Sequence, residues 1–298
     1  MLLNTSTLQL ELKEYLLLEA SKLKNENKLG PLFSIIVGNI PEQESYVRIK
    51  KRVGNEVGID VRKITLPDNI STNDLIGTIQ DLSNNQGAKG IIIQQPLPQN
   101  IDLKKVYDSV QDHIEIEGHK SESKYVFPLV QACMIGLYEA MEFELGFTER
   151  KLTLPFNPSK ELLDWLCAKK IVIAGNGLTT GSQIAKYFRK KGIDFSQTNS
   201  KTDNPDSLYK TADIIITGVG KNIINKDNIK PGVILLNFGL RSENLTENGI
   251  LHKKLKGDYD EEEVRHIASL YTSTPGGLGP IDVLCLLGNH LEGCRKSI

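Results

Sequence analysis

The apolar positions of this chain follow two alternating spacings, which predict strands that alternate with helices. Short apolar-rich runs, the pattern of strands that a sheet buries, occur at 31–37, 59–66, 89–94, 171–174, 193–198, 212–217 and 232–237. Apolar residues at helical spacing occur at 7–25, 41–58, 74–85, 102–110, 129–141, 159–167, 184–188 and 280–298. Alternation of this kind is typical of parallel α/β sheets with helices on both faces. The pattern therefore predicts an α/β fold, and 298 residues suffice for two domains.

A glycine-rich turn separates one predicted strand from the helix that follows it. The segment 169–183 reads KKIVIAGNGLTTGSQ, with glycines at Gly175, Gly177 and Gly181. Dinucleotide binding needs this order of strand, turn and helix, since Gly175 permits a tight turn and Gly177 lets a phosphate approach the backbone. The helix start would present N–H groups and a positive dipole end to that phosphate. The alternative is a structural turn that binds no nucleotide, because the G-x-G-x-x-x-G spacing is one residue longer than the common fingerprint.

The strand after this turn indicates which nicotinamide cofactor the chain would take. An acid at the end of that strand binds the ribose 2′-hydroxyl of NAD, whereas a basic group accommodates the 2′-phosphate of NADP. Here the strand at 193–198 is followed by NSKT at 199–202, which contains Lys201 and no acid, and Asp194 lies at the other end. The sequence therefore favours NADP, with NAD as the alternative.

Polar side chains at predicted element ends are the candidates for chemistry. Tyr46 and Lys50 are four residues apart and share one face of a predicted helix, although such a pair is usually a surface coincidence. Gln94 ends a buried strand, and the proline two residues later turns the chain out at the carboxyl edge of the sheet, where ligands bind. Gln94 could equally be a strand-end cap. Glu115 and Glu117 lie in a loop, where paired acids are mostly solvated.

Composition removes several classes of protein from consideration. Lys plus Arg number 36 against 37 for Asp plus Glu, a net charge of −1, so no basic surface for nucleic acid is indicated. No apolar run is long enough to span a bilayer, and the start MLLNTSTLQLELKEY lacks the pattern of a secretory signal. The four cysteines form no C-x-x-C pair and the five histidines are scattered. These features predict a cytoplasmic protein with reduced cysteines and without a metal site.

Eight segments, taken together in their order, resemble one known family. They are SYVRIKKRVGNEVGI, IIIQQPLP, EIEGHK, AGNGLTTG, NSKT, KPGVILLNFGL, GDYD and STPGGLGPIDVLCLLGN. The chain is similar over nearly its whole length to the bifunctional methylenetetrahydrofolate dehydrogenase/methenyltetrahydrofolate cyclohydrolase family. The segments with Gln-x-Pro-Leu-Pro and Pro-Gly-Gly are the most specific parts of this resemblance.

The resemblance implies a fold, an activity and an assembly. Residues 1–150 would form an N-terminal three-layer α/β folate domain, with the helix at 280–298 packing back on it. Residues 151–279 would form a Rossmann-type NAD(P)-binding domain, and the folate would lie in the cleft between the two. The protein would oxidise 5,10-methylenetetrahydrofolate to 5,10-methenyltetrahydrofolate with NADP, and then hydrolyse it to 10-formyltetrahydrofolate. The family also implies a homodimer in the cytoplasm.

The resemblance further assigns roles to individual residues. Lys50 would guide proton movement around the attacking water if its pKa is lowered toward neutrality. Gln94 would hold the Lys50 side chain, Tyr46 would offer a flat face for the aminobenzoate ring, and Glu117 would accept from the pterin N–H groups. The implied catalytic set is Lys50, Tyr46, Gln94 and Glu117. The implied substrate-binding set is Tyr46, Gln94, Pro96, Glu117, Pro275, Gly276 and Gly277. The implied cofactor-binding set is Gly175, Asn176, Gly177, Gly181, Ser200 and Leu240.

Several positions depart from the family pattern and motivate rival hypotheses. The family usually has Asp at Glu117, Arg-Ser at Asn176–Gly177, His at Asn199, Asp at Asn237 and Thr at Asp282, and the segment between Gly118 and Pro155 is longer than usual. These departures suggest a non-catalytic or single-activity folate- or nucleotide-binding paralogue. A Rossmann dehydrogenase for another small molecule is the third hypothesis, but it leaves the Tyr–Lys helix beside Gln-x-Pro-Leu-Pro unexplained.

Overall fold

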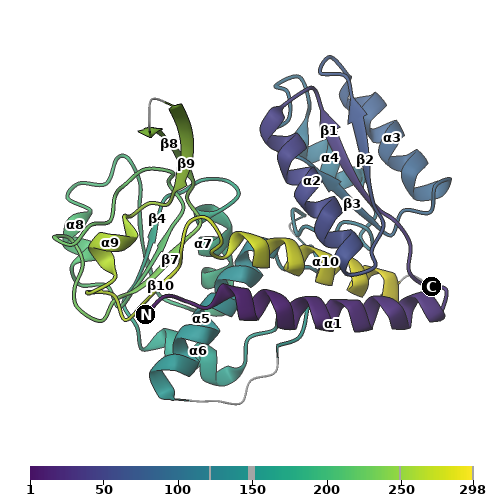
Figure 1. The fold of residues 1–298 in the computed structure, drawn as a ribbon. Coiled ribbons are helices and arrows are strands. Elements are labelled where there is room, and N and C mark those ends of the chain that lie inside the picture. The colour runs from purple at the N-terminus through teal and green to yellow at the C-terminus, as the bar shows by residue number, and fades with distance from the viewer. Residues whose placement is uncertain (121, 147–151, 248–249, 297–298) are drawn as a thin grey trace. The chain divides into compact units, whose positions relative to one another are not determined.

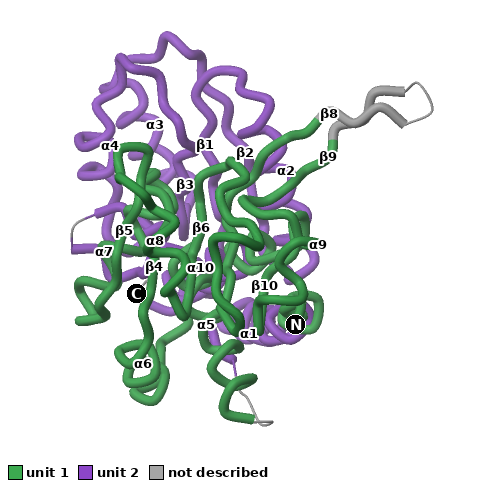
Figure 2. The backbone as a smooth tube through the Cα atoms, turned by 90° about the vertical axis from the view of Figure 1, so that its left-hand side faces the viewer, with its two compact units in different colours: residues 1–9, 129–151, 156–282 green, residues 10–128, 152–155, 283–298 purple. Residues whose placement is uncertain are grey.

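The computed structural model describes residues 1–120, 122–146, 152–247 and 250–296. Backbone contacts divide the chain into two compact units (Figure 2). Unit 1 consists of residues 1–9, 129–151 and 156–282, and unit 2 of residues 10–128, 152–155 and 283–298. The domain boundary predicted between residues 150 and 151 lies outside the described residues. In the described part of the chain, none of the helices combines the length and the apolar composition needed to cross a membrane.

Unit 2 is built on a three-stranded parallel sheet in the order β2-β1-β3. Its strands are β1 (Leu32–Val37), β2 (Val61–Leu66) and β3 (Gly90–Ile93). Every residue of β1 and β3 is buried, as expected for strands covered on both faces. The loop after β3 adds to this sheet, because Ile91 N donates to Ile114 O at 2.9 Å and Glu115 forms a parallel bridge with Ile91.

Helices cover both faces of this sheet, which gives the expected three layers (Figure 1). One face packs Phe33 and Ile35 against Leu75 of α3 (Thr72–Asn84) and Val106 of α4 (Leu103–Ser109). The opposite face carries Ser34 and meets α2 (Pro41–Glu56). Unit 2 also contains most of α1 (Thr5–Asn25) and of α10 (Gly279–Lys296).

The two ends of α2 and the start of α3 follow local sequence rules. Proline stands at the first position of α2, where its missing N–H costs no hydrogen bond. Gly58 follows the helix with φ of +79°, a conformation that favours glycine. Ser71 caps α3 by accepting a hydrogen bond from Asp74 N at 3.1 Å. The helix predicted over 41–58 is therefore confirmed, and the helix predicted from residue 74 begins at Thr72, directly after its cap Ser71.

Unit 1 contains a five-stranded parallel sheet in the order β10-β7-β6-β4-β5. Its strands are β4 (Ile171–Ala174), β5 (Ser196–Thr198), β6 (Ile214–Thr217), β7 (Ile234–Asn237) and β10 (Leu270–Tyr271). Its helices are α5 (Pro128–Leu145), α6 (Lys160–Cys167), α7 (Gly181–Lys191), α8 (Asp206–Tyr209) and α9 (Glu261–Val264). The strand order reverses direction at β4, which places the glycine-rich turn beside a topological switch point. Leu2 extends the sheet by a parallel bridge to Tyr271.

One antiparallel element was not predicted. Strands β8 (Arg241–Glu247) and β9 (Ile250–Lys256) pair in register, with Arg241 opposite Lys256 and Glu247 opposite Ile250. This pair stands apart from the five-stranded sheet as a separate two-stranded sheet. Figure 1 shows it projecting from unit 1.

Candidate active site

Three polar side chains of unit 2 form a line from α2 into the sheet. Lys50 Nζ donates to Gln94 Oε1 at 3.3 Å, and Gln94 Nε2 donates to Ser34 Oγ at 2.9 Å. Gln94 is 6 % exposed and Ser34 is fully buried, whereas Lys50 is half-buried. The amide of Gln94 therefore has a fixed orientation, with its oxygen toward the amine. The structure brings together Lys50 and Gln94 as the sequence led us to expect.

The loop after α4 places Glu117 at the same end of β3. Residues 114–116 run parallel to β3, so Glu117 comes level with Ile93. Its carboxylate, rather than its backbone, accepts a hydrogen bond from Ile93 N at 3.3 Å. The charge of Lys50 acts on this carboxylate and favours its ionised form. Lys50, Gln94 and Glu117 therefore belong to one polar cluster of unit 2.

The expectation that Glu115 and Glu117 are solvated is wrong. Glu115 is 2 % exposed, and its Oε1 accepts from the backbone N–H groups of residues 117, 118 and 119 at 3.2, 2.9 and 3.1 Å. Its Oε2 accepts from Ser123 Oγ at 2.8 Å. A buried carboxylate can be retained when several donors satisfy it. Glu115 therefore fixes the turn that carries Glu117, and Gly118, with φ of +83°, passes so close to Tyr125 O that a Cβ would lie 2.8 Å from it.

The environment of Glu117 changes its acid–base behaviour. Burial raises the pKa of its carboxyl group to about 7. The positive charge of Lys50 and the hydrogen bond from Ile93 N oppose this rise, and the negative charge of Glu115 adds to it. A carboxyl group with such a pKa changes its hydrogen-bonding capacity near neutral pH, because only the ionised form is a pure acceptor.

Tyr46 and Pro96 lie on the exposed side of this cluster. The side chain of Tyr46 is 50 % exposed although it is aromatic, and Pro96 is also exposed. Gln43, one turn before Tyr46 on α2, donates from Nε2 to Pro96 O at 2.8 Å while it is itself 2 % exposed. Gln43 thus ties the loop after β3 to the helix that carries Tyr46 and Lys50. No pattern in the sequence predicts this role of Gln43.

The glycine-rich turn of unit 1 has the geometry of a phosphate-binding turn. Gly175 has φ of +108°, and a Cβ on Gly181 would lie 2.1 Å from Gly175 O, so the turn is tight. A Cβ on Gly177 would meet nothing within 4 Å, so its surroundings are open. Among the described residues, no side chain caps α7 at Thr180, and the backbone N–H groups of Ser182 and Gln183 donate to Gly177 O and Thr180 O, both at 3.1 Å. Asn176 accepts from Ser182 Oγ at 2.8 Å through its carbonyl oxygen. These residues fit the phosphates of a dinucleotide.

The end of β5 lies beside this turn, because Thr198 pairs with Ala174. Asn199 Oδ1 accepts from Lys201 N at 2.8 Å, and Asn199 N donates to Thr202 Oγ1 at 2.9 Å. These bonds fix a turn on which Ser200 and Lys201 are exposed. The turn presents a cation and no carboxylate, which fits the 2′-phosphate of NADP better than the bare ribose of NAD.

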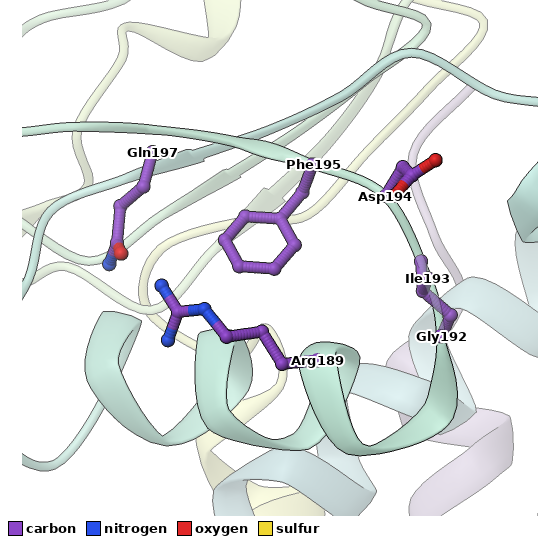
Figure 3. A pocket seen from close by; sticks show the side chains of 6 residues that line it. All are labelled: Arg189, Gly192, Ile193, Asp194, Phe195 and Gln197. Carbon is purple, nitrogen blue, oxygen red and sulfur yellow. The ribbon is translucent and has the colours of Figure 1, made fainter.

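Asp194 lies at the opposite end of β5. It lines a shallow cavity of about 430 Å³ together with Arg189, Gly192, Ile193, Phe195 and Gln197 (Figure 3). The guanidinium carbon of Arg189 lies 5.2 Å from the centre of the Phe195 ring. Asp194 precedes the first residue of β5, whereas the glycine-rich turn follows the last residue of β4, which runs parallel to β5. The acid therefore lies at the opposite edge of the sheet from the turn and does not supply the ribose ligand of an NAD site.

A second polar network joins the loops after β6 and β7. Asn237 Oδ1 accepts from Thr217 Oγ1 at 2.9 Å, and Asn237 Nδ2 donates to Gly239 O and Thr274 Oγ1, both at 2.8 Å. Asp258, which is fully buried, accepts from the N–H groups of residues 219, 220 and 221 at 2.7, 2.7 and 3.1 Å. Burial raises the pKa of Asp258, and these donors oppose the rise. Leu240, a predicted cofactor residue, is 50 % exposed next to this network.

The Pro-Gly-Gly segment forms a tight loop of unit 1. Gly276 has φ of +94°, and its carbonyl oxygen accepts from Thr5 Oγ1 at 2.6 Å. A Cβ on Gly277 would lie 2.5 Å from Ser273 O, so only glycine fits there without a shift. Pro275, Gly276 and Gly277 therefore present backbone rather than side chains to their surroundings.

The fold, the glycine-rich turn of unit 1 and the polar cluster of unit 2 define an α/β protein of the dinucleotide-binding class with a second, smaller α/β unit. The model for the tetrahydrofolate dehydrogenase/cyclohydrolase catalytic domain matches residues 3–117, and the model for the NAD(P)-binding domain of the same family matches residues 161–298. The chain belongs to the tetrahydrofolate dehydrogenase/cyclohydrolase family. The resemblance inferred from the sequence is thus confirmed.

Individual relatives agree with this assignment. The bifunctional protein FolD of Pelagibacter ubique is 30 % identical over 295 residues, which cover 96 % of this chain and 95 % of the relative. The crystal structure of the bifunctional FolD dehydrogenase/cyclohydrolase from Campylobacter jejuni is 26 % identical, with a TM-score of 0.82 and coverage of 100 % and 99 %. The Trypanosoma brucei enzyme, complexed with NADP and an inhibitor, shares the fold at 20 % identity, with a TM-score of 0.79 and coverage of 99 % and 97 %.

Proposed function

We propose that this chain is a bifunctional enzyme of one-carbon folate metabolism. It oxidises 5,10-methylenetetrahydrofolate to 5,10-methenyltetrahydrofolate with NADP, and then hydrolyses that product to 10-formyltetrahydrofolate. The observation that carries the proposal is the line Lys50–Gln94–Ser34 in the same unit as the buried carboxylate of Glu117. A basic amine with a fixed partner is what the hydrolytic step needs, and family membership supplies the substrate.

In the first step a hydride leaves the methylene carbon, and the folate becomes a methenyl cation. NADP, when bound, accepts this hydride at its nicotinamide. The chain contributes binding and orientation, which account for a large part of the barrier reduction in such transfers. Gly175, Asn176, Gly177 and Gly181 would hold the phosphates, while Ser200 would contact the ribose phosphate and Leu240 the nicotinamide side.

In the second step water adds to the methenyl carbon, one C–N bond of the ring opens, and one proton is released. The amine of Lys50 would guide proton movement around the attacking water. Gln94 holds the amine through Oε1 and limits the positions that the amine can take. The same amine can return the proton to the nitrogen that leaves the ring.

Four further contacts would place the folate. Tyr46 offers an exposed aromatic face to the aminobenzoate ring. Glu117, when ionised, accepts from the pterin N–H groups. Pro96 and the backbone of Pro275, Gly276 and Gly277 complete the substrate-binding set. Residues 1–150 with 280–298 would carry the folate chemistry, and residues 151–279 the nucleotide.

The protein would act as a homodimer in the cytoplasm. Family resemblance supports the dimer, which sedimentation equilibrium measures directly. Free cysteines at 133, 167, 285 and 294 support a reducing compartment.

A turnover assay with separate detection of the two products tests the proposal. Purified protein receives 5,10-methylenetetrahydrofolate with either NADP or NAD, and the methenyl and 10-formyl products are followed separately. We expect 10-formyltetrahydrofolate above the uncatalysed rate, with NADP preferred. Accumulation of the methenyl compound alone would identify a single-activity dehydrogenase. Absence of product with both cofactors, together with tight folate binding, would identify a non-catalytic paralogue instead.

A further inference from the structure

Glu117 has a further ionisable neighbour that the proposed mechanism does not use. His119 Nε2 lies 3.9 Å from Glu117 Oε2, and the two side chains are 15 % and 14 % exposed. Both residues belong to the turn that the buried carboxylate of Glu115 closes, since the N–H groups of both donate to Glu115 Oε1. Their backbones are therefore held in a fixed relation, and the imidazole and the carboxylate meet across Gly118.

Aromatic rings fix the position of the imidazole. Tyr107 stacks on it with ring centres 4.2 Å apart and an interplanar angle of 28°. Phe127 meets it edge-on, with centres 5.1 Å apart and an angle of 84°. Tyr107 is in turn held by a hydrogen bond from Gln95 Nε2 to its hydroxyl at 3.3 Å. A ring held in this way keeps Nε2 directed at Glu117 without a large loss of side-chain entropy.

The other groups that face Glu117 do not make its carboxyl group fully ionised or fully protonated at neutral pH. Lys50 on α2 favours the ionised form, and Glu115 on the same loop disfavours it. Tyr107 on α4 faces the carboxylate as well, and β3 contributes the N–H of Ile93. Burial outweighs the charge of Lys50 and leaves the pKa of Glu117 at about 7. At neutral pH a carboxyl group of this kind is divided between its two forms unless another cation acts on it.

We propose that His119 is a positioning residue for Glu117, which as an imidazolium increases the ionised share of the carboxylate near neutral pH and orients it toward the pterin. The inference rests on the proposed function of this site, since it assigns the purpose of the pair to folate binding. It also accounts for the glutamate at this position. Glutamate has one methylene more than aspartate, so the carboxylate of Glu117 lies farther from the backbone. There it lies beside the imidazole of His119.

The pair predicts a titration that the ligand-free protein reports without any turnover. The carboxyl group of Glu117 is followed by carbon-13 NMR of glutamate-labelled protein, with E117Q to assign its signal. We expect His119→Phe, which keeps a ring between Tyr107 and Phe127, to raise the titration midpoint by about half to one pH unit. His119→Gln is the second variant, and it should give the same shift if the charge is what matters. A midpoint unchanged in both variants would overturn the pairing.

Steady-state kinetics then test the purpose of the pair. In His119→Phe the KM for methylenetetrahydrofolate should rise about three- to tenfold near pH 6.5 and return toward the wild-type value near pH 8.5, with kcat changed less than twofold. Substitution Glu117→Asp should remove most of this effect of His119→Phe, because the shorter carboxylate lies farther from the ring. If the titration midpoint shifts in the His119 variants but the wild-type protein shows no turnover, the His119–Glu117 pairing is supported and the proposed function is rejected. Normal turnover with a KM that is indifferent to His119 at every pH would reject the positioning role.

Discussion

The hydroxyl of Ser34 holds the side-chain amide of Gln94 inside unit 2. Gln94 Nε2 donates to Ser34 Oγ at 2.9 Å, so Gln94 Oε1 is left to accept from Lys50 Nζ at 3.3 Å. Ser34 is the polar residue in a strand of otherwise apolar, fully buried positions. Such a residue needs a partner inside the protein, and here that partner holds the proposed catalytic amine.

Ser34 is a buried residue, but removal of its hydroxyl should lower the rate of the cyclohydrolase step. In Ser34→Ala the amide N–H of Gln94 loses its acceptor, which should lower the free energy of unfolding by about 1–2 kcal/mol and let the amide turn. We expect the cyclohydrolase rate to fall about tenfold and the dehydrogenase rate to change little. Ser45→Ala on α2 is the matched control. Hydrolysis at the wild-type rate in Ser34→Ala would show that the amide orientation is irrelevant.

Asp258 should be required for the loop that follows β6. It accepts from three backbone N–H groups, and in Asp258→Asn one of these would face the amide N–H₂. We expect a loss of about 2–4 kcal/mol in the free energy of unfolding and a higher KM for the nucleotide. Thermal denaturation of Asp258→Asn beside Asp227→Asn, an exposed control, measures the first effect. Equal melting temperatures would contradict the role given to this carboxylate.

His290 should make the fold less stable in acid. Its Nε2 lies 3.1 Å from Gly30 O, and burial lowers its pKa to about 4. Between the usual value near 6.5 and about 4, the unfolded chain binds a proton that the folded chain does not. The free energy of unfolding should therefore fall by roughly 3 kcal/mol as pH decreases through this window. Urea denaturation across that range should show the fall in the wild type and a flatter profile in His290→Gln.

Glu117 should act on stability in the opposite direction. Its pKa is about 7 in the folded chain against 4.5 for the free group, so the folded chain binds the extra proton between these values. The free energy of unfolding should fall as pH rises from about 4.5 to 7, partly cancelling the effect of His290. In Glu117→Gln this opposing slope disappears, and the loss of stability in acid should become steeper. The same slope in wild type and Glu117→Gln would mean that Glu117 is ionised in the folded protein.

The choice of cofactor should depend on Lys201. It is exposed on the turn that Asn199 fixes after β5, where NADP carries its additional phosphate. In Lys201→Ala we expect the KM for NADP to rise about five- to tenfold and the KM for NAD to stay the same. Lys210→Ala, another exposed lysine, controls for a general effect of charge. An equal rise for both cofactors would contradict the assignment.

Much of the fold could be predicted because its strands are buried and its turns are local. The runs at 31–37, 89–94 and 171–174 became β1, β3 and β4 because a sheet covered on both faces needs continuous apolar residues. The hairpin β8–β9 was missed because its strands, RSENLTE and ILHKKLK, are rich in charge and lack a clear alternation. The Asn-Gly dipeptide between them is a turn signal that could have indicated it.

The chemistry of the site was predictable where it depends on neighbours in sequence, and hidden where it depends on packing. Tyr46 and Lys50 share a helix face by spacing alone, and Gly175 and Gly177 belong to one turn. Glu115 looked like a solvated acid, because no local pattern shows that the turn after it directs three N–H groups at its carboxylate. The partners of Ser34 and Asp258 likewise come from other segments of the chain.

The ratio of the two products formed by Lys50→Met shows whether Lys50 carries out the hydrolytic step. Methionine keeps the length of the side chain and removes the amine, and Lys51→Met on the exposed side of the same helix is the control. We expect Lys50→Met to bind folate and still form the methenyl compound, while formation of 10-formyltetrahydrofolate falls at least about a hundredfold, to near the uncatalysed rate. Lys51→Met should match the wild type in both steps. Hydrolysis by Lys50→Met at the wild-type rate would show that Lys50 takes no part in the mechanism.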